Sequence, residues 1–191
     1  MGQVYALTIP GTMPVSVSQF HSYVRLPDTM TADDATIAIM IAAATVWGEK
    51  YTGRDFRDNV HELTLDRFST RICLRRDPVV SISSITYLVG GVETTVPSSI
   101  YYLKKNVQDS EILLEAGAEW PSDGDEVTDG REGSIKVTFV TEPYSCEGEL
   151  INVVNQIVAH LWSERGDCTT GDAAKASGAT ATLNQFRIAR I

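Results

Sequence analysis

Hydrophobic side chains between residues 32 and 52 recur at spacings of three and four, the period of an α-helix. Thr31 and Asp34 form a Thr-x-x-Asp capping box before this run, and Gly53 can adopt the left-handed conformation that ends a helix. The pattern predicts a long helix at 32–52 with one apolar face. The positions on that face are Ile37, Met40, Ile41, Ala44, Trp47 and Tyr51.

A shorter helix is predicted at 17–24, because Ser16 and Gln19 have the spacing of a second capping box. Residues 1–15 precede it and contain closely spaced proline and glycine, which favour irregular backbone. This first segment is therefore expected to form an extended arm.

The apolar period changes to two between residues 57 and 144, which is typical of half-buried strands. Gly90-Gly91 separates two strand-like runs and fits the turn of a hairpin. The region predicts a small antiparallel sheet or sandwich of about six or seven strands. Candidate strands lie around His61–Leu65, Ile72–Leu74, Val80–Val89, Val92–Val96, Ile100–Leu103, Glu111–Glu115 and Ser134–Val140.

Helical spacing returns after Ser145, where Leu150, Val154 and Leu161 lie on one wide apolar stripe, and it predicts a helix at 147–164. The expected fold class is α+β. The N-terminal helix pair and the C-terminal helix would form a helical bundle, with an inserted small antiparallel sheet or sandwich and an extended C-terminal arm. The expected division is an N-terminal arm at 1–15, a helical core at 16–56 and 145–165, a β-rich insertion at 57–144, and a linker with a docking tail at 166–191.

The chain from Gly166 to Thr182 contains no large apolar residue and consists mostly of Gly, Ala, Ser and Thr. Such a segment buries little apolar surface, so it predicts a flexible linker. The large apolar and basic residues that follow favour a docking arm over a frayed terminus, and their alternation would suit strand addition to another subunit. The predicted docking tail comprises Leu183, Phe186, Arg187, Ile188, Arg190 and Ile191.

The charge balance weighs against a protein that grips nucleic acid. Asp and Glu number 25 against 16 Lys and Arg, a formal net charge of −9, whereas phosphate binding needs a basic surface. The acidic excess is compatible with a surface past which DNA slides. No apolar run approaches the ~18 residues of a membrane span, and no secretion signal is expected. The odd number of cysteines, without a Cys-x-x-Cys pair, indicates synthesis in a reducing cytosol.

Catalytic chemistry finds little support in the sequence. His21, His61 and His160 lie in no metal-binding or nucleophile motif, and no cofactor or catalytic residue is predicted. The acidic run at 119–132 supplies hard oxygen donors but lacks the spacing of an EF-hand loop, so a solvated loop is favoured over a calcium site. The acidic residues of that loop are Asp123, Asp125, Glu126 and Asp129.

Several short motifs follow one another along the chain: Val24-Arg25-Leu26, Asp33-Asp34, Tyr51-Thr52-Gly53-Arg54, Pro78-Val79, Trp120-Pro121, Ala159-His160-Leu161-Trp162 and Leu183-Asn184-Gln185-Phe186-Arg187. Their order and spacing, over about residues 14–191, resemble those of the head–tail connector, or adaptor, proteins of long-tailed bacteriophages. The chain departs from that family at Gln185, where proline is usual, and at Glu142-Pro143-Tyr144, where Gly-Tyr is more common.

The resemblance implies a structural virion protein without enzymatic activity. Members of that family form a ring, usually a dodecamer, beneath the portal protein of the filled head, where it extends the DNA tunnel and docks the next neck protein. The implied partners are the portal, a stopper or other tail-side neck protein, further copies of the chain, and genomic double-stranded DNA that passes without specific binding. The family's C-terminal segment commonly contacts the portal, which implies that role for residues 183–191.

Two alternatives stay open. A different neck component, such as a stopper or tail terminator, is expected to be richer in β-structure and to lack a long helix like that predicted at 32–52. The alternative from another class is a metal-binding module that uses the acidic loop at 119–132.

Overall fold

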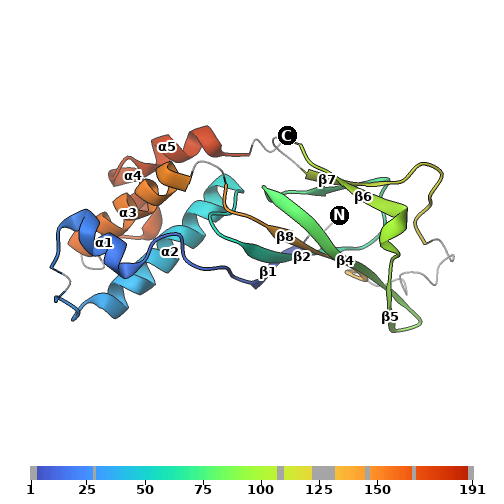
Figure 1. Cartoon of the computed structure of the whole chain (residues 1–191), viewed down its shortest axis with the longest axis horizontal. Helices are drawn as coiled ribbons and strands as arrows, with labels where there is room; N and C mark the ends of the chain where they lie inside the picture. The colour runs from blue at the N-terminus through green and yellow to red at the C-terminus, as the bar shows by residue number, and fades with distance from the viewer. Residues whose placement is uncertain are drawn as a thin grey trace. The chain divides into compact units, whose positions relative to one another are not determined.

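The computed structural model describes residues 4–27, 29–106, 110–121, 132–144, 147–164 and 167–188. The chain divides into two compact units, each built from two separate stretches of sequence. The β unit comprises Met1–Gly11 and Asp58–Glu142, and the helical unit comprises Thr12–Arg57 and Pro143–Ile191. Helices and antiparallel sheets together make a mixed α+β fold, with the elements labelled in Figure 1.

Within the described residues, the strands of the β unit form two antiparallel sheets, of order β1-β2-β8-β4-β5 and β3-β7-β6. The predicted strands are confirmed, and Gly90-Gly91, both with positive φ, join β4 to β5 as a hairpin turn. The elements are β1 (Val4–Ile9), β2 (Asn59–Leu65), β3 (Arg71–Leu74), β4 (Val79–Val89), β5 (Val92–Thr95), the 3-10 turn η1 (Ser98–Ile100), β6 (Tyr101–Lys104), β7 (Ser110–Leu114) and β8 (Ile135–Thr141).

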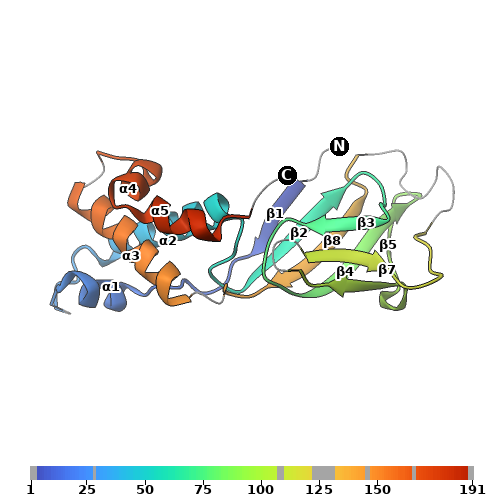
Figure 2. The same ribbon diagram turned by 90° about the horizontal axis from the view of Figure 1, so that it is seen from above.

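Side chains from both sheets meet in one hydrophobic core. Leu63 and Phe139 of the larger sheet and Ile72 and Ile112 of the smaller one are fully buried. Figure 2 shows the three-stranded sheet lying over the five-stranded one. Along β2, buried and half-buried positions alternate, which is the period-two pattern expected for a strand with one face on a core.

The extended arm expected at 1–15 is in part a strand of the larger sheet. β1 pairs with β2, and the Tyr5 hydroxyl donates to the Cys73 carbonyl (3.0 Å) and accepts from the Arg75 amide (3.1 Å). The proline and glycine that suggested irregular backbone lie after this strand, whereas β1 itself contains Val4, Tyr5 and Ile9, the β-branched and aromatic types that favour a sheet.

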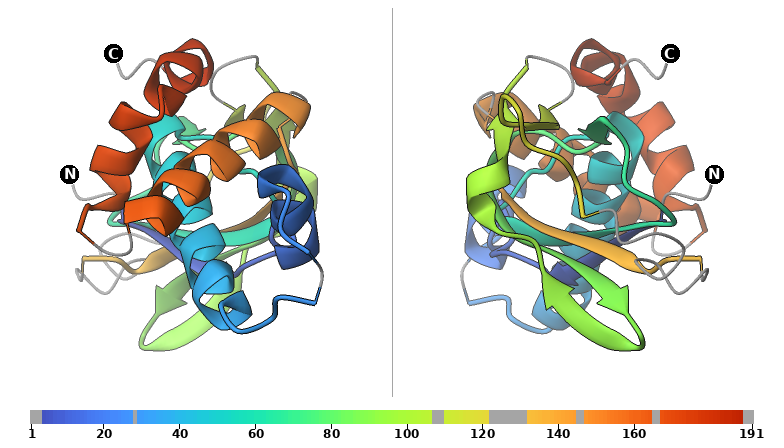
Figure 3. Two further views of the ribbon diagram at one scale, coloured as in Figure 1. Left: turned by 90° about the vertical axis from the view of Figure 1, so that its left-hand side faces the viewer. Right: turned by 90° about the vertical axis from the view of Figure 1, so that its right-hand side faces the viewer.

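The predicted helices of the helical unit are confirmed as α1 (Val17–Val24), α2 (Asp34–Thr52) and α3 (Glu147–Glu164). The Ser16–Gln19 capping box of α1 is present, with both reciprocal hydrogen bonds. Gly53 ends α2 with φ of 79°, in the left-handed region. In Figure 3 (left), α1 lies on one side of α3, and the two C-terminal helices, α4 and α5, lie on the other.

The capping box predicted at Thr31 and Asp34 is wrong. Asp33 occupies the N-cap position and makes no side-chain cap, while Thr31 accepts the Asp34 amide through its backbone carbonyl (3.2 Å). The Asp34 carboxylate instead faces the buried His21 imidazole, with 3.0 Å between Oδ1 and Nε2. This contact joins α1 to the first residue of α2.

The flexible linker predicted at 166–182 is also wrong over its described part. α4 (Thr170–Ala176) and α5 (Ala179–Phe186) fold onto α2 and α3. Ala173, Ala174 and Ala179 are fully buried in the same core as α2 and α3. Alanine is the best helix former and its small side chain allows close helix packing, so the lack of large apolar residues does not prevent order.

No helix among the described residues is long and apolar enough to cross a membrane.

Candidate functional site

The turn that ends α2 holds the C-terminal segment, defined here as residues 183–188. The Ile188 amide donates to the Thr52 carbonyl (2.8 Å), and the Arg54 guanidinium donates through Nε to the Phe186 carbonyl (2.8 Å). The carbonyl of the last residue of α5 and an amide just beyond the helix thus gain partners on a distant turn. Residues more than 130 positions apart in the sequence are fixed to each other.

Aromatic contacts cover the same Arg54 side chain. Its guanidinium lies 4.1 Å from the centroid of the Tyr144 ring, a cation–π distance. The Phe186 ring packs edge-on against Tyr144, with 5.9 Å between centroids. Arg54 is only 5% exposed, so its charge is held between a ring face and a carbonyl instead of water.

Tyr51 contacts the C-terminal segment from the last turn of α2. Its hydroxyl donates to Asn184 Oδ1 (2.6 Å), and the Arg187 guanidinium lies 5.4 Å from its ring centroid. On its other side the Tyr51 ring stacks on Trp47, with 4.9 Å between centroids. The contact therefore uses side chains as well as backbone groups.

Gly53 allows the close approach of the C-terminal segment. Its φ of 79° is strained for any residue with a Cβ, and a Cβ added there would lie 3.3 Å from Ile188 Cδ1. The Thr52 hydroxyl stabilises the turn by accepting the Arg54 amide (3.1 Å) and donating to the Gly48 carbonyl (2.9 Å). Every residue of the Tyr51-Thr52-Gly53-Arg54 motif thus contributes to the turn or to its contact with residues 183–188.

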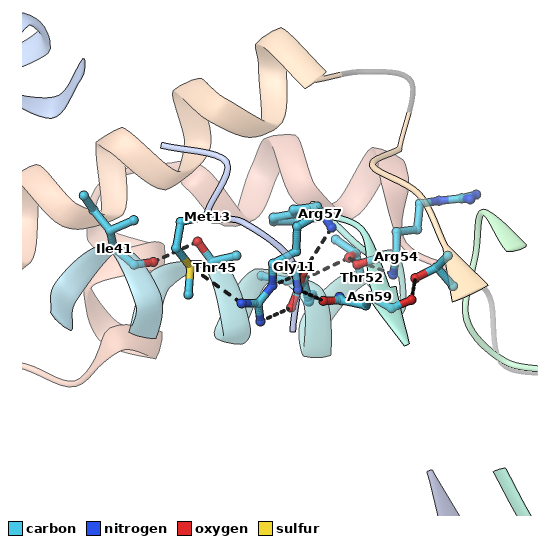
Figure 4. Close-up of polar contacts among 12 residues, drawn as sticks. Gly11, Met13, Ile41, Thr45, Thr52, Arg54, Arg57 and Asn59 are labelled. Carbon is cyan, nitrogen blue, oxygen red and sulfur yellow. Dashed lines mark hydrogen bonds and ion pairs between the residues drawn. The ribbon is translucent and has the colours of Figure 1, made fainter. Parts of the chain in front are cut away.

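A buried ion pair lies beside this turn in the helical unit (Figure 4). Arg57 binds Glu49 through two bonds, Nε to Oε1 and Nη2 to Oε2, both 3.1 Å. Glu49 Oε1 also accepts the Phe56 amide (3.2 Å), and Arg57 Nη1 contacts Met13 Sδ (3.6 Å). Both charged side chains are under 7% exposed, so the bidentate geometry is needed to offset their desolvation.

The residues of the predicted docking tail have different environments. Leu183 is fully buried and Ile188 is 7% exposed, Phe186 is half-buried, and Arg187 is exposed. The premise that these apolar side chains project from a flexible tether is therefore wrong for Leu183 and Ile188, which pack within their own unit. Arg190 and Ile191 lie outside the described residues.

The acidic-loop residues Asp123, Asp125, Glu126 and Asp129 also lie outside the described residues. Across the part of the chain that the structure describes, no group of three His, Cys, Asp or Glu side chains is placed to hold a metal ion.

The three histidines are spread over both units. His21 pairs with Asp34 on the helical unit, and His160 lies half-buried on α3. His61, on β2 of the β unit, stacks on Phe139, with 5.4 Å between ring centroids.

A second surface feature, which the sequence patterns did not reveal, lies on the outer face of α2. A shallow and mostly apolar hollow is lined by α2 and by the first residue of α4, Thr170. Beside it, Ile39 is 70% exposed. The signal available in the sequence was that α2 is apolar on both faces, since residues 35–47 contain only two polar side chains, both threonine.

A side-chain hydrogen bond at the start of α4 changes the pKa of Asp172. The Thr169 hydroxyl donates to Asp172 Oδ2 (2.6 Å) and lowers the pKa of that carboxyl below its usual value. The Asp172 amide donates in return to Thr169 Oγ1 (3.2 Å), which caps the helix.

No protein-family model and no curated protein sequence matches the chain. Solved structures with the same fold exist over the full length. A chain in the virion of a native gene transfer agent (GTA) particle superposes with a TM-score of 0.75 and 22% identity, covering 100% of this chain and 97% of that one. Chains in the neck of an empty GTA particle computed with C6 symmetry (TM-score 0.74) and of a native one computed with C12 symmetry (0.73) have the same identity and coverage. The likeness establishes that this chain shares their fold.

Proposed function

We propose that the chain is a structural subunit of a virion neck, where copies of it assemble into a ring around the path of the DNA. The observation that carries the proposal is the full-length fold likeness to neck chains, which covers both units and 97% of those chains. A ring of identical subunits is the form of assembly that rotational symmetry of the neck requires. The net charge of −9 supports a passage that does not retain DNA, because a basic wall would bind phosphates.

Within the neck, we assign the chain the role of head–tail adaptor, the ring that contacts the portal directly. The order of motifs along the chain resembles that family, and α2 is the long helix that a β-rich stopper or tail terminator is expected to lack. The stopper or another tail-side neck protein would then bind the opposite side of the ring. The assignment requires no cofactor and no catalytic residue.

The portal contact is proposed to comprise Arg187, within the C-terminal segment, and the residues that follow this segment in the sequence. Leu183 and Ile188 anchor the segment on its own unit, so their proposed role is to position the contact residues. Arg187 is exposed, and Arg190 and Ile191 follow it in the sequence. Together these three residues offer two cations and one apolar side chain to a partner.

Mixing the purified full chain with purified portal rings tests the adaptor role. An adaptor binds the bare portal, and negative-stain electron microscopy should show an added ring on it. A stopper, in contrast, binds only after an adaptor has bound. The adaptor assignment would be contradicted if this chain failed to bind the bare portal but did bind portal isolated together with its neck proteins.

A truncation that removes residues 189–191 tests the portal contact separately. It leaves the contacts of residues 183–188 with α2 in place, so the truncated chain should keep its stability and lose affinity for the portal. Unchanged portal affinity in the truncated chain and in an Arg187→Glu variant would exclude this contact.

A further inference from the structure

The outer face of α2 is apolar and has no partner within the described residues of its unit. Ile37, Ile41 and Ala44 point into the core, as expected for an amphipathic helix. The opposite face carries no charge along its first three turns, and its exposed positions are Ala35, Thr36, Ala38, Ile39 and Ala43. A helix that is apolar on both faces is typical of burial on both faces.

The hollow on this face gives it a defined shape. Val46 and Trp47 contribute apolar lining, Lys50 lies at one end, and Thr170 of α4 forms the neighbouring wall. Gly171 lies against the Trp47 ring, where an added Cβ would be 3.3 Å from Nε1, so α4 approaches α2 closely there. The surface is therefore a shallow socket of fixed helices, suited to an apolar side chain from another molecule.

The same helical unit exposes large apolar side chains elsewhere. Tyr23 of α1 is 43% exposed, and Met30, in the connection from α1 to α2, is 52% exposed. A turn closed by the Met30 amide and the Pro27 carbonyl (2.9 Å) holds this connection. Neither Tyr23 nor Met30 lines the hollow, so the socket and these side chains are two separate apolar surfaces of the unit. Figures 2 and 3 show α1 on the side of α3 opposite to α4.

We propose that the socket of α2 receives Tyr23 and Met30 from a second copy of this chain. Two different apolar surfaces on one unit are what a heterologous contact requires, and such a contact repeats around a ring. The C6 and C12 symmetry of the neck particles that contain this fold favours a second copy over an unrelated partner. The inference rests on the proposed function, since it names the surface through which the ring closes.

Charge substitution on the socket face is the first test. Ile39→Asp places a carboxylate at the most exposed large apolar side chain of α2 and removes no core contact. Val92→Asp on β5, at 66% exposure, is the matched control because it makes the same chemical change in the β unit. In sedimentation velocity over a range of concentrations, Ile39→Asp should weaken self-association at least about tenfold, as expected at the centre of an interface. Val92→Asp should associate like the wild type. Circular dichroism confirms that both variants are folded.

Site-specific photocrosslinking identifies the opposite surface. A benzoylphenylalanine introduced at position 39 of the full chain should give crosslinked multimers on irradiation, with the crosslinked peptides mapping to residues 20–33 of a second copy. Crosslinks to other parts of a second copy, or a wild-type chain that remains monomeric at every concentration, would overturn the proposal.

The outcomes separate this inference from the proposed function. Closed rings of both the wild type and Ile39→Asp in electron micrographs would refute the socket contact and leave the neck role intact. If the wild type forms only dimers or open chains, with and without the portal, and Ile39→Asp abolishes this association, the contact is supported and the ring is refuted. Equal weakening by Ile39→Asp and Val92→Asp would show a general charge effect and refute the contact.

Discussion

Truncation of Leu183 measures how firmly the C-terminal segment is packed. The side chain is fully buried between α5 and the core of the helical unit. Leu183→Ala removes three carbons, worth about 2.4 kcal/mol at ~0.8 kcal/mol for each buried methylene, and the cavity left behind adds to this loss. We expect the free energy of unfolding of the helical unit to fall by about 3 kcal/mol, within the range of buried Leu→Ala changes.

The assay must report on the helical unit alone, because two units need not unfold together. Trp47 and Trp162 belong to the helical unit, and Trp120 is the tryptophan of the β unit. In a Trp120→Phe background, tryptophan fluorescence during urea denaturation follows the helical unit. Gln185→Ala, an exposed change on the same helix, is the control. If Leu183→Ala lies within about 0.5 kcal/mol of this control, the segment is not packed and the reasoning fails.

The remaining predictions concern the turn after α2 and its surroundings. Glu49→Gln leaves the Arg57 charge buried without its ionic partner, and should lower the free energy of unfolding by about 3–5 kcal/mol in the same urea assay; a loss under about 1 kcal/mol would contradict the buried pair. Gly53→Ala should cost about 1 kcal/mol or more through its positive φ, and a neutral result by thermal denaturation would exclude the left-handed turn. Because the pKa of Asp172 is lowered, its ionised carboxylate stabilises α4 at pH values above 3.8, the ordinary pKa of the group. This contribution is lost as the pH falls through the lowered pKa. NMR titration should show that Thr169→Val returns the pKa of Asp172 toward its ordinary value, whereas an unchanged pKa would rule out the hydroxyl as its cause.

Local sequence patterns were sufficient for the elements that bury a stripe of large side chains. The helix predicted at 147–164 is α3 with the same bounds, and the Gly90-Gly91 hairpin is present. In both cases the signal lies within a few residues of the element itself. These elements could be predicted because their burial requires the spacing that the sequence displays.

The C-terminal segment could not be predicted in the same way. α4 and α5 are stabilised by small buried residues such as Ala173 and Ala179, which composition alone does not distinguish from a flexible linker. The contact of Arg54 with the Phe186 carbonyl joins positions 132 residues apart, and no local pattern encodes it. The motifs at residues 51–54 and 183–187 are both present in the sequence, and the structure shows that they contact each other.

The outer face of α2 shows a different limit. The sequence pattern predicts one apolar stripe on the helix, because residues at three- and four-residue spacings form a surface that can face a core. Ile39 and the alanines between the positions of that stripe are also apolar, but a helical period identifies only the face with the larger apolar side chains. Their exposure depends on which elements pack against α2 within its unit, and the helix sequence does not encode this.

Locating the chain in assembled particles tests the central claim most directly. The hairpin turn at Gly90-Gly91 accepts an added Cβ without contacts, so a short epitope inserted between these glycines should leave the β unit intact. Antibody labelling of purified particles that carry this insertion should place the label at the junction of head and tail in electron micrographs. Label on the capsid shell or the tail tip, or intact particles that contain none of the protein, would contradict the neck assignment.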